Sequence, residues 1–239
     1  MQTQDIDYGA DGATLRGFLA FDEADGPRPG VLVFHEGLGL GDFAMEKARQ
    51  LAALGYVALA ADMFGERRQA RNLQEVATMV GGLRAEPERL RARALAALTA
   101  LAGLPQVDRG KLAAIGFCFG GSVVLELARS GAELKAVVSF HGVLATKLPA
   151  AEGQVKASVL VLTGADDPLA APDQVVAFEA EMRAAKVADW QVVSYGNTLH
   201  GFANPAADGS MMRTALYHAQ SDRRSWAAMQ ALFEEVLGK

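Results

Sequence analysis

Short apolar runs alternate with amphipathic segments along most of the chain. A strand covered on both faces of a parallel sheet reads as a continuous apolar run of about four to eight residues. Such runs lie at residues 31–35, 56–61, 112–117, 136–140 and 158–163. Segments with apolar residues at helical spacing lie at residues 42–54, 72–83, 87–101, 119–130 and 172–186. The alternation predicts an α/β fold with a mostly parallel sheet flanked by helices on both faces.

The two ends of the chain complete this architecture. Residues 15–21 (LRGFLAF) follow the turn signal Asp11-Gly12 and have the composition of a strand. A hairpin-like start predicts a mixed sheet with antiparallel strands at its N-terminal edge. At the other end we expect a strand over residues 190–195 and an amphipathic helix over about 222–237, with Ser221 as its N-cap.

The composition narrows the class of protein. The chain has 239 residues, a net charge of −5 and a single cysteine. The negative charge disfavours nucleic acid and anionic membranes as partners, and no apolar run reaches the roughly 18 residues of a membrane span. A single cysteine precludes an internal disulfide and a Cys-rich zinc module. The absence of a disulfide fits a protein of a reducing compartment. Because no linker and no export signal are visible, we expect one soluble, cytoplasmic domain over residues 1–239.

The single cysteine lies at a strand-to-helix junction with glycines on both sides. Gly116-Phe-Cys118-Phe-Gly120 is a Gly-x-nucleophile-x-Gly elbow with Cys in place of the more common Ser. Such a sharp turn brings the strand and helix backbones so close that only Gly fits two positions either side. It exposes the thiol in front of a helix N-terminus, which stabilises a thiolate, and the amide of Phe119 can donate to an oxyanion. A small buried hydrophobe is the alternative for a lone cysteine, but the glycine frame favours a nucleophile.

Candidates for the acid and the base follow in the chain order nucleophile, acid, histidine. Asp167 lies in Gly-Ala-Asp-Asp-Pro, directly after the predicted strand at residues 158–163. It is the favoured orienting carboxylate, and Asp166 is the reserve; an ordinary turn is the alternative for this segment. His200, in Asn-Thr-Leu-His-Gly-Phe after the last predicted strand, is the candidate base.

Three other histidines compete for that role. His35 precedes the nucleophile and His218 lies near the C-terminal end, so neither fits the order. His141 follows the strand predicted next to the elbow strand and is a candidate wall of the substrate pocket. Phe64 and Phe202 are expected in the same wall because they also follow predicted strands.

These residues together are similar to the dienelactone hydrolase family of the α/β-hydrolase superfamily, over nearly the whole chain. The resemblance implies an α/β-hydrolase fold and a triad of Cys118, Asp167 and His200. It also implies that the enzyme cleaves a lactone or activated ester, a small-molecule substrate, through an acyl-enzyme intermediate. The motifs that carry it are His35-Glu36, Gly-Phe-Cys118-Phe-Gly-Gly, Gly-Ala-Asp-Asp167-Pro, His200-Gly-Phe-Ala-Asn-Pro205 and Asp222-Arg-Arg-Ser-Trp226.

The resemblance also assigns roles beside the nucleophile. The family's glutamate, matched by Glu36, pairs with the resting cysteine and controls its proton until substrate binds. A carboxylate near a buried thiol can hold that proton. The amide of Gly37 would complete an oxyanion hole with that of Phe119. The alternative for Glu36 is a charge that complements the dipole of the helix that follows.

The sequence departs from the family pattern where the substrate is chosen. An arginine four residues after the catalytic histidine helps to bind the substrate carboxylate in the family, and Asn204 stands there in this chain. A second family arginine has no clear match, although Arg67, Arg68 and Arg71 are nearby in the sequence. We therefore expect Asn204 in the pocket and regard a neutral ester or lactone as at least as good a candidate as an anionic dienelactone.

Two functions of other classes compete with hydrolysis. Residues 37–41 (GLGLG) follow a strand and precede Asp62, as in a dinucleotide-binding unit, but Asp42 would point a carboxylate at the pyrophosphate. A non-catalytic binding protein on a hydrolase scaffold is the second alternative, disfavoured because nucleophile, acid and base all stand in order. We expect no cofactor and no metal, because the four histidines are scattered. No feature of the sequence predicts an oligomeric state.

Overall fold

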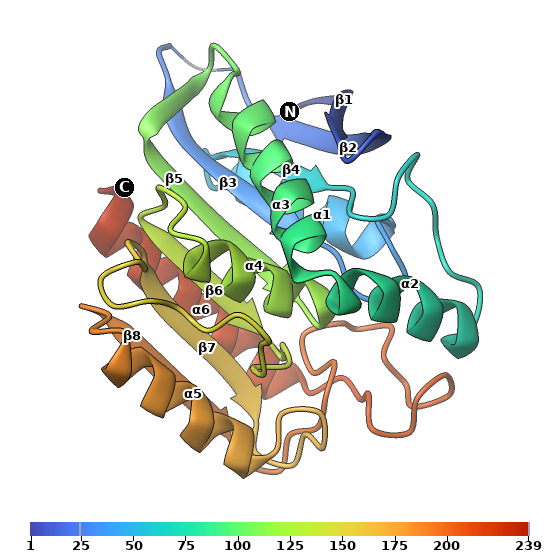
Figure 1. Cartoon of the computed structure of the whole chain (residues 1–239). Coiled ribbons are helices and arrows are strands. Elements are labelled where there is room, and N and C mark those ends of the chain that lie inside the picture. Colours follow the sequence, from blue (N-terminus) through green and yellow to red (C-terminus); the bar gives the residue numbers. More distant parts are fainter. Residues whose placement is uncertain (24, 239) are drawn as a thin grey trace.

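The strands of the chain join in a single mixed sheet. The computed structural model describes residues 1–23 and 25–238 (Figure 1). In this part of the chain the strands are β1 (Gln2–Ala10), β2 (Ala13–Phe21), β3 (Arg28–Phe34), β4 (Val57–Ala61), β5 (Val107–Phe117), β6 (Ala136–Phe140), β7 (Ser158–Gly164) and β8 (Trp190–Tyr195). Their spatial order is β1-β2-β4-β3-β5-β6-β7-β8. β2 pairs antiparallel with both β1 and β4, and the strands from β4 to β8 run parallel. The predicted mixed sheet with an antiparallel N-terminal edge is confirmed.

Helices cover both faces of the sheet, as predicted. They are α1 (Asp42–Ala53), α2 (Leu73–Ala85), α3 (Pro87–Ala102), α4 (Phe119–Arg129), α5 (Pro172–Ala184) and α6 (Ala219–Leu237). One apolar core lies between the sheet and α3, α4 and α5, and the other lies under α1 and α6 (Figure 1). Residues of β5 enter the two cores alternately, because successive side chains of a strand point to opposite faces. Leu112 and Ala114 belong to the core under α3, α4 and α5, and Ala113 and Ile115 belong to the core under α1 and α6.

The register aligns the carboxyl ends of the parallel strands. Phe34 of β3 pairs with Gly116 of β5, and Gly116 pairs in turn with Ser139 of β6. The chain passes from β3 to β4 on one side and returns to β5 on the other, so the order of the sheet reverses at β3. Ligands of open α/β sheets bind outside the carboxyl ends of the strands at such a reversal. The loops after β3, β5, β6, β7 and β8 therefore come together at one edge.

The start of the last helix differs from the prediction. α6 begins at Ala219 rather than near residue 222, and its N-cap is His218 instead of Ser221. The backbone amide of Ser221 donates to the His218 ring at 3.3 Å, while the Ser221 hydroxyl lies 2.8 Å from that of Thr198. Ser221 thus uses its side chain to tie the first turn to the loop after β8, and an imidazole nitrogen does the capping.

The motif Asp222-Arg-Arg-Ser-Trp226 joins α6 to α1 around a buried cation. The Lys47 ammonium lies 3.9 Å from the Asp222 carboxylate and 4.5 Å from the centroid of the Trp226 ring. Burial lowers the pKa of Lys47, and the nearby carboxylate acts against that shift. The motif that contributes to the family resemblance therefore has a packing role on the face opposite α4.

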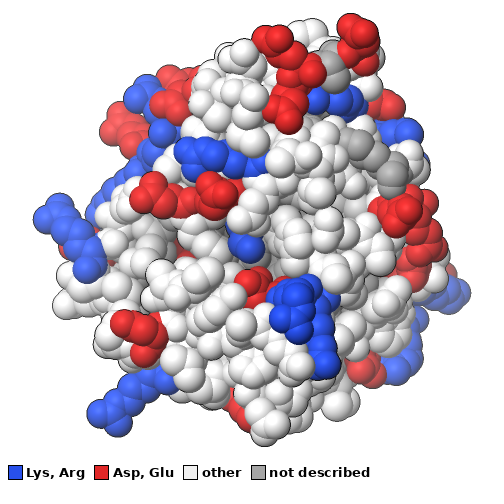
Figure 2. Space-filling model, turned by 180° about the vertical axis from the view of Figure 1, so that it is seen from behind, with Lys and Arg blue, Asp and Glu red and all other residues white. Residues whose placement is uncertain are grey.

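Charge is mixed over the surface that carries α1 and α6. On the face drawn in Figure 2, acidic and basic side chains are interspersed, and neither sign forms a continuous stripe. A basic stripe is the usual electrostatic footprint of a nucleic-acid-binding protein. The face over α1 and α6 therefore carries both signs of charge without segregation.

A buried ion network fastens α4 to its neighbours. Arg129 is only 2% exposed and donates to the Glu181 carboxylate of α5 at 2.7 and 2.8 Å. It also donates to Glu126 at 3.1 Å and to the backbone oxygen of Leu144, in the loop after β6, at 2.8 Å. Arg91 of α3 completes the network with a 2.9 Å bond to Glu126. The network connects three helices and the loop after β6.

Truncation of this arginine will destabilise the fold. Arg129→Ala leaves Glu126 and Glu181 buried without their cation, and we expect a loss of about 3–5 kcal/mol in the free energy of unfolding. Arg183→Ala is the control, because its side chain is 62% exposed, pairs with Glu179 along α5 and lies 5.2 Å from the centroid of the Trp190 ring, so we expect a loss of about 1 kcal/mol or less. Urea unfolding followed by circular dichroism measures both. Equal losses in the two variants would contradict a structural role for the network.

Candidate active site

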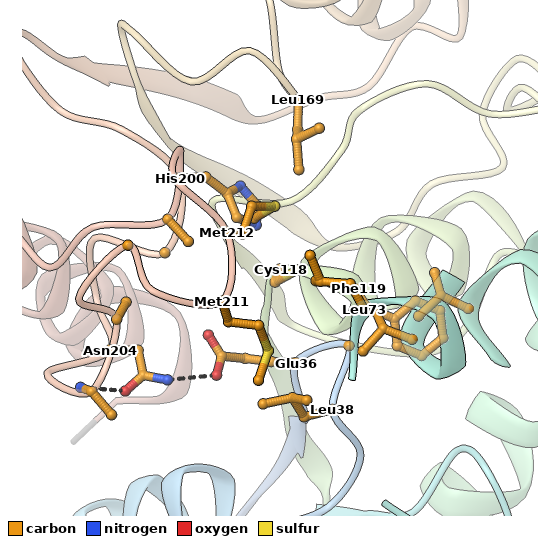
Figure 3. Close-up of a pocket in the computed structure, with 18 of the residues that line it drawn as sticks. Glu36, Leu38, Leu73, Cys118, Phe119, Leu169, His200, Asn204, Met211 and Met212 are labelled. Atoms are coloured by element: carbon orange, nitrogen blue, oxygen red, sulfur yellow. Dashed lines mark hydrogen bonds between the residues drawn. The ribbon is translucent and has the colours of Figure 1, made fainter. Parts of the chain in front are cut away.

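A cavity opens at the carboxyl edge of the sheet, where the register brings the loops together. Its volume is about 360 Å³, within the range of small-molecule sites. The walls come from the loops after β3, β6, β7 and β8, from α2, and from the start of α4 (Figure 3). The sequence-predicted site residues that line it are Glu36, Gly37, Cys118, Phe119, His200 and Asn204.

Cys118 occupies a strained turn between β5 and α4. Its backbone has φ 54° and ψ −111°, a conformation that a side chain adopts only where the surroundings enforce it. A Cβ at Gly116 would lie 2.0 Å from the backbone oxygen of Gly120, and one at Gly120 would lie 2.2 Å from that of Phe34. Both glycines are therefore required by backbone contact, which is the steric reason given for the Gly-x-Cys-x-Gly frame.

The backbone amide of Cys118 is held from the neighbouring strand. It donates to the backbone oxygen of Phe140 at 3.0 Å and to Nδ1 of His141 at 3.1 Å. Because Nδ1 of His141 accepts, the proton of its neutral ring is on Nε2. Burial lowers the pKa of His141 well below its usual value, and the charge of nearby His200 lowers it further. His141 is therefore a neutral ring that braces the elbow.

His200 and Asp167 form a buried pair next to Cys118. Nδ1 of His200 lies 2.8 Å from Oδ2 of Asp167, and the other oxygen of Asp167 accepts from the backbone amide of Leu169 at 2.8 Å. Asp166 is exposed, so the structure places the favoured aspartate, not the reserve, beside the ring. Burial alone would lower the pKa of His200, but the charge of Cys118 and the bond to Asp167 outweigh it and raise the pKa to about 10.

Glu36 is held by Asn204. The amide nitrogen of Asn204 donates to the Glu36 carboxylate at 2.6 Å (Figure 3), and its amide oxygen accepts from the backbone of Ala206 at 2.9 Å. Burial raises the pKa of Glu36, and the bond from Asn204 acts against that rise. The residue that stands in place of the family arginine thus engages Glu36 directly, on the side of the cavity formed by the loop after β8.

The two residues whose amides are expected to bind an oxyanion both line the cavity. Phe119 is the first residue of α4, so its amide has no acceptor within the helix. Gly37 follows Glu36, and a Cβ there would lie 2.9 Å from the side chain of Val76. Both residues line the cavity with Cys118. Their role as an oxyanion hole remains a prediction.

Three of the four expected pocket walls lie behind the cavity rather than in it. Asn204 lines it, but the described lining does not include Phe64, His141 or Phe202. His141 and Phe202 are fully buried, with ring centroids 5.1 Å apart, and Phe64 stacks on Phe119 at 5.5 Å. A residue that directly follows a strand lies at the carboxyl edge of the sheet, but the local backbone decides where its side chain points. At His141 φ is +41°, and the side chain turns inward.

The two competing histidines have structural partners. Nε2 of His35 accepts from the backbone amide of Met63 at 3.2 Å, and burial lowers the pKa of the ring. His218 caps α6. Neither His35 nor His218 belongs to the described lining of the cavity.

The sequence reasoning missed α2 as a wall of the cavity. Val76, Val80 and Arg84 of this helix line it, and they stand at i, i+4 and i+8, so they share one face. Arg84 donates to the hydroxyl of Ser122 at 3.0 Å; burial lowers its pKa, and the charge of Cys118 acts against that shift. A cation in line with the apolar positions of a helix is the signal that could have revealed it.

Arg67, which the sequence left as a candidate, is occupied elsewhere. It pairs with Asp5 of β1 at 2.6 Å.

Within residues 1–23 and 25–238, no group of three or more His, Cys, Asp or Glu side chains could hold a metal ion. No helix of that part is long and apolar enough to span a membrane.

Comparison with known proteins identifies the relatives of this chain. The dienelactone hydrolase family model matches residues 15–237. The solved structure called m3DLH is 45% identical, with a TM-score of 0.95 over 99% of this chain and 98% of that one. The dienelactone hydrolase-like promiscuous phosphotriesterase P91, from metagenomic libraries, is 44% identical, with a TM-score of 0.92 over 98% of both chains. A putative carboxymethylenebutenolidase of Escherichia coli K12 is 28% identical over 91% of this chain and 80% of its own length.

The matches confirm two expectations from the sequence. The sheet and its helices have the α/β-hydrolase fold of these structural neighbours, and the enzyme class is a carboxylic ester or lactone hydrolase. The chain belongs to the dienelactone hydrolase family.

Proposed function

We propose that this chain, as a single domain over residues 1–239, hydrolyses a lactone or activated ester with Cys118 as nucleophile. The observation that carries the proposal is a cysteine on a strained elbow that shares a cavity with a buried His200–Asp167 pair, joined at 2.8 Å. Nucleophile, base and orienting carboxylate are the three parts that an acyl-transfer site requires.

The reaction divides into two displacements. The Cys118 thiolate attacks the carbonyl carbon, and the Gly37 and Phe119 amides bind the oxyanion that forms. The carbon–oxygen bond then breaks as His200 protonates the departing alkoxide, which stays tethered in a lactone, and a thioester remains. A water molecule, deprotonated by His200, attacks the thioester. Cleavage of the carbon–sulfur bond releases the carboxylic acid and restores the thiolate and the imidazolium.

The charge of Cys118 determines whether His200 acts as an acid or as a base, because it changes the pKa of the ring between the two displacements. Once Cys118 is a thiolate, its charge and Asp167 outweigh burial and hold the pKa of His200 at about 10, so the ring is protonated at neutral pH and ready to donate. Acylation removes the negative charge from sulfur. The charge of Cys118, the largest of the causes that raise the pKa of His200, then disappears, and the ring can act as a base toward water.

Glu36 is the group we assign to the thiol proton. Its carboxyl group lines the same cavity as Cys118, and the hydrogen bond from Asn204 stabilises its ionised form against burial. An ionised Glu36 can accept the thiol proton when substrate enters. In this arrangement Asn204 is a positioning residue that keeps the carboxylate oriented and charged.

A second candidate reaction is the hydrolysis of a phosphotriester. The observation that favours it is the 44% identity to P91 over 98% of both chains, together with that protein's description as a promiscuous phosphotriesterase. A phosphotriester is uncharged, like a carboxylic ester, and the thiolate would attack phosphorus in place of carbon. Hydrolysis of paraoxon and of p-nitrophenyl acetate, each measured in the wild type and in Cys118→Ala, tests whether both reactions use Cys118: we expect the variant to lose both.

The proposed partner is a small-molecule ester or lactone in a reducing compartment. An accessible thiolate is oxidised readily, so the chemistry requires a compartment such as the cytoplasm. Neither nucleic acid nor a membrane has a role in this proposal.

Removal of the nucleophile or its orienting acid will abolish turnover. Cys118→Ala and Asp167→Ala should each lower kcat/KM for p-nitrophenyl acetate by about 10³-fold or more. Iodoacetamide should inactivate the wild type, and mass spectrometry of a rapidly quenched reaction should find one acetyl group on Cys118. Asp166→Ala is the matched control and should keep nearly full activity. If Cys118→Ala retained wild-type turnover, the mechanism would be wrong.

Loss of the Asn204 hydrogen bond will shift the acid limb of the rate profile. The bond favours the ionised Glu36 and so lowers its pKa. In Asn204→Ala that pKa rises, less Glu36 is ionised at a given acidic pH, and the acid limb of kcat/KM should move to higher pH by about one unit. Asn204→Asp, with a like charge beside Glu36, should move it further. An acid limb at the wild-type position in both variants would remove Glu36 from the reaction.

The brace from His141 to the elbow can be tested with two replacements. His141→Asn keeps an acceptor where Nδ1 stands, whereas His141→Phe keeps a ring but has none. We expect His141→Phe to lower kcat about tenfold or more through displacement of the thiol, with KM nearly unchanged, and His141→Asn to recover most of it. Because Asn also tolerates positive φ better than Phe, rates are compared at a temperature where melting curves show both variants folded. Equal kcat values in the two variants would exclude the brace.

A further inference from the structure

Three large apolar side chains lie exposed at the entrance of the cavity. Leu73 is 46% exposed, Leu169 37% and Met211 48%, yet each also lines the cavity (Figure 3). They come from separate segments of the chain: the first turn of α2, the loop after β7 and the loop after β8. We call these three residues the apolar mouth. Grouped exposed apolar side chains on a soluble protein mark binding surfaces.

The interior between the apolar mouth and Cys118 is also apolar. Its lining side chains include Leu38, Val76, Val80, Val143 and Met212. Apolar surface thus continues from the solvent to Cys118. The apolar group that fills the cavity is therefore part of the same ester that reacts there.

The charged groups of the described lining offer little to an anion that ends at the apolar mouth. Glu36 accepts from Asn204, and His200 pairs with Asp167. Asp208, also in the lining, accepts from the backbone amide and the hydroxyl of Ser210. Arg84 donates to the neutral hydroxyl of Ser122, but it lies in the last turn of α2, whereas Leu73 of the apolar mouth lies in the first. An anionic group at the apolar mouth would therefore lie unpaired among apolar side chains, and burial of an unpaired charge is strongly unfavourable.

We propose that the substrate carries an uncharged, apolar acyl group of about four to eight carbons, whose far end rests on the apolar mouth. This inference depends on the proposed function, because it places the carbonyl on Cys118. The acyl group, rather than the alcohol, fills the cavity because it stays bonded to sulfur from the first displacement to the end of the second. Methionine side chains adapt to differently shaped apolar groups, so Met211 and Met212 favour a range of chains over a single one.

The proposal sets the size of the chain-length effect. Each methylene moved from water into an apolar site contributes about 0.8 kcal/mol, or about fourfold in kcat/KM. A substrate series with one leaving group isolates this effect: p-nitrophenyl acetate, butanoate and hexanoate. From acetate to hexanoate, with four added methylenes half to fully buried, kcat/KM should rise about 16- to 250-fold.

A matched pair of esters tests the preference for an uncharged group. The p-nitrophenyl half-ester of glutaric acid and p-nitrophenyl 5-methylhexanoate have the same shape, but the first ends in a carboxylate and the second in an isopropyl group. We expect kcat/KM to be at least about 30-fold higher for the 5-methylhexanoate. If the half-ester reacts as fast, the cavity accepts an anion and the proposal is overturned.

Variants of the apolar mouth connect the effect to these residues. Leu73→Glu and Met211→Glu should each lower the ratio of hexanoate to acetate kcat/KM by about fivefold or more, and Met211→Leu should keep the wild-type ratio. Leu95→Glu is the control, since Leu95 is similarly exposed, at 38%, on α3 outside the described lining. It should change neither rate. An unchanged ratio in both mouth variants would overturn the proposal.

The outcomes separate this inference from the proposed function. If acetate hydrolysis survives in Cys118→Ala, the proposed function fails whatever the chain-length series shows. If acetate hydrolysis depends on Cys118 but the wild-type rate does not rise with chain length, only the apolar acyl site fails. Size-exclusion chromatography of Met211→Glu and the wild type supplies the remaining outcome. A change from oligomer to monomer would show that the apolar mouth is a contact between copies, and would overturn its assignment to the acyl group.

Discussion

The close backbone contact at the elbow is the constraint on which the rest of the site depends. Gly116 meets the backbone of Gly120, and Gly120 in turn meets that of Phe34, so β5, α4 and β3 approach to distances that no side chain permits. The amide of Gly120 donates to the backbone oxygen of His35 at 3.0 Å and fastens that approach. It fixes the N-terminus of α4 beside the loop that carries Glu36, so Cys118, both candidate oxyanion amides and Glu36 share one frame.

Electrostatics in this frame is coupled through Cys118. Asp167 is fixed by the backbone amide of Leu169 and holds Nδ1 of His200, while the charge of Cys118 raises the pKa of the same ring. His141, at the back of the pair, is neutral because burial lowers its pKa well below the usual value. A second imidazolium there would repel the first. In the proposed mechanism, His200 is protonated while Cys118 carries its charge, the ring of His141 stays neutral beside it, and acylation of sulfur removes the charge of Cys118.

The sequence predicts those parts of the molecule that depend on local pattern and chain order. The parallel strands and their helices follow from hydrophobic periodicity, and the glycine frame singles out Cys118 because its cause is steric and local. Asp167 and His200 follow from order, since each comes after a strand whose carboxyl end lies at the same edge. The direction of a side chain at that edge depends on tertiary packing. Sequence position therefore did not separate Asn204, which lines the cavity, from His141 and Phe202, which pack behind it.

Asn204 connects the catalytic frame to the choice of substrate. An arginine at this position would bring a cation to the mouth of the site, available to a substrate carboxylate. The shorter, neutral amide of Asn204 instead donates to Glu36 and accepts from the backbone amide of Ala206. Asn204 in place of the family arginine therefore offers no cation to a substrate carboxylate, and its amide favours the ionised form of Glu36 against the effect of burial. Both effects favour substrates held by apolar contact, because an added anion would meet Glu36 with no arginine at position 204 between them.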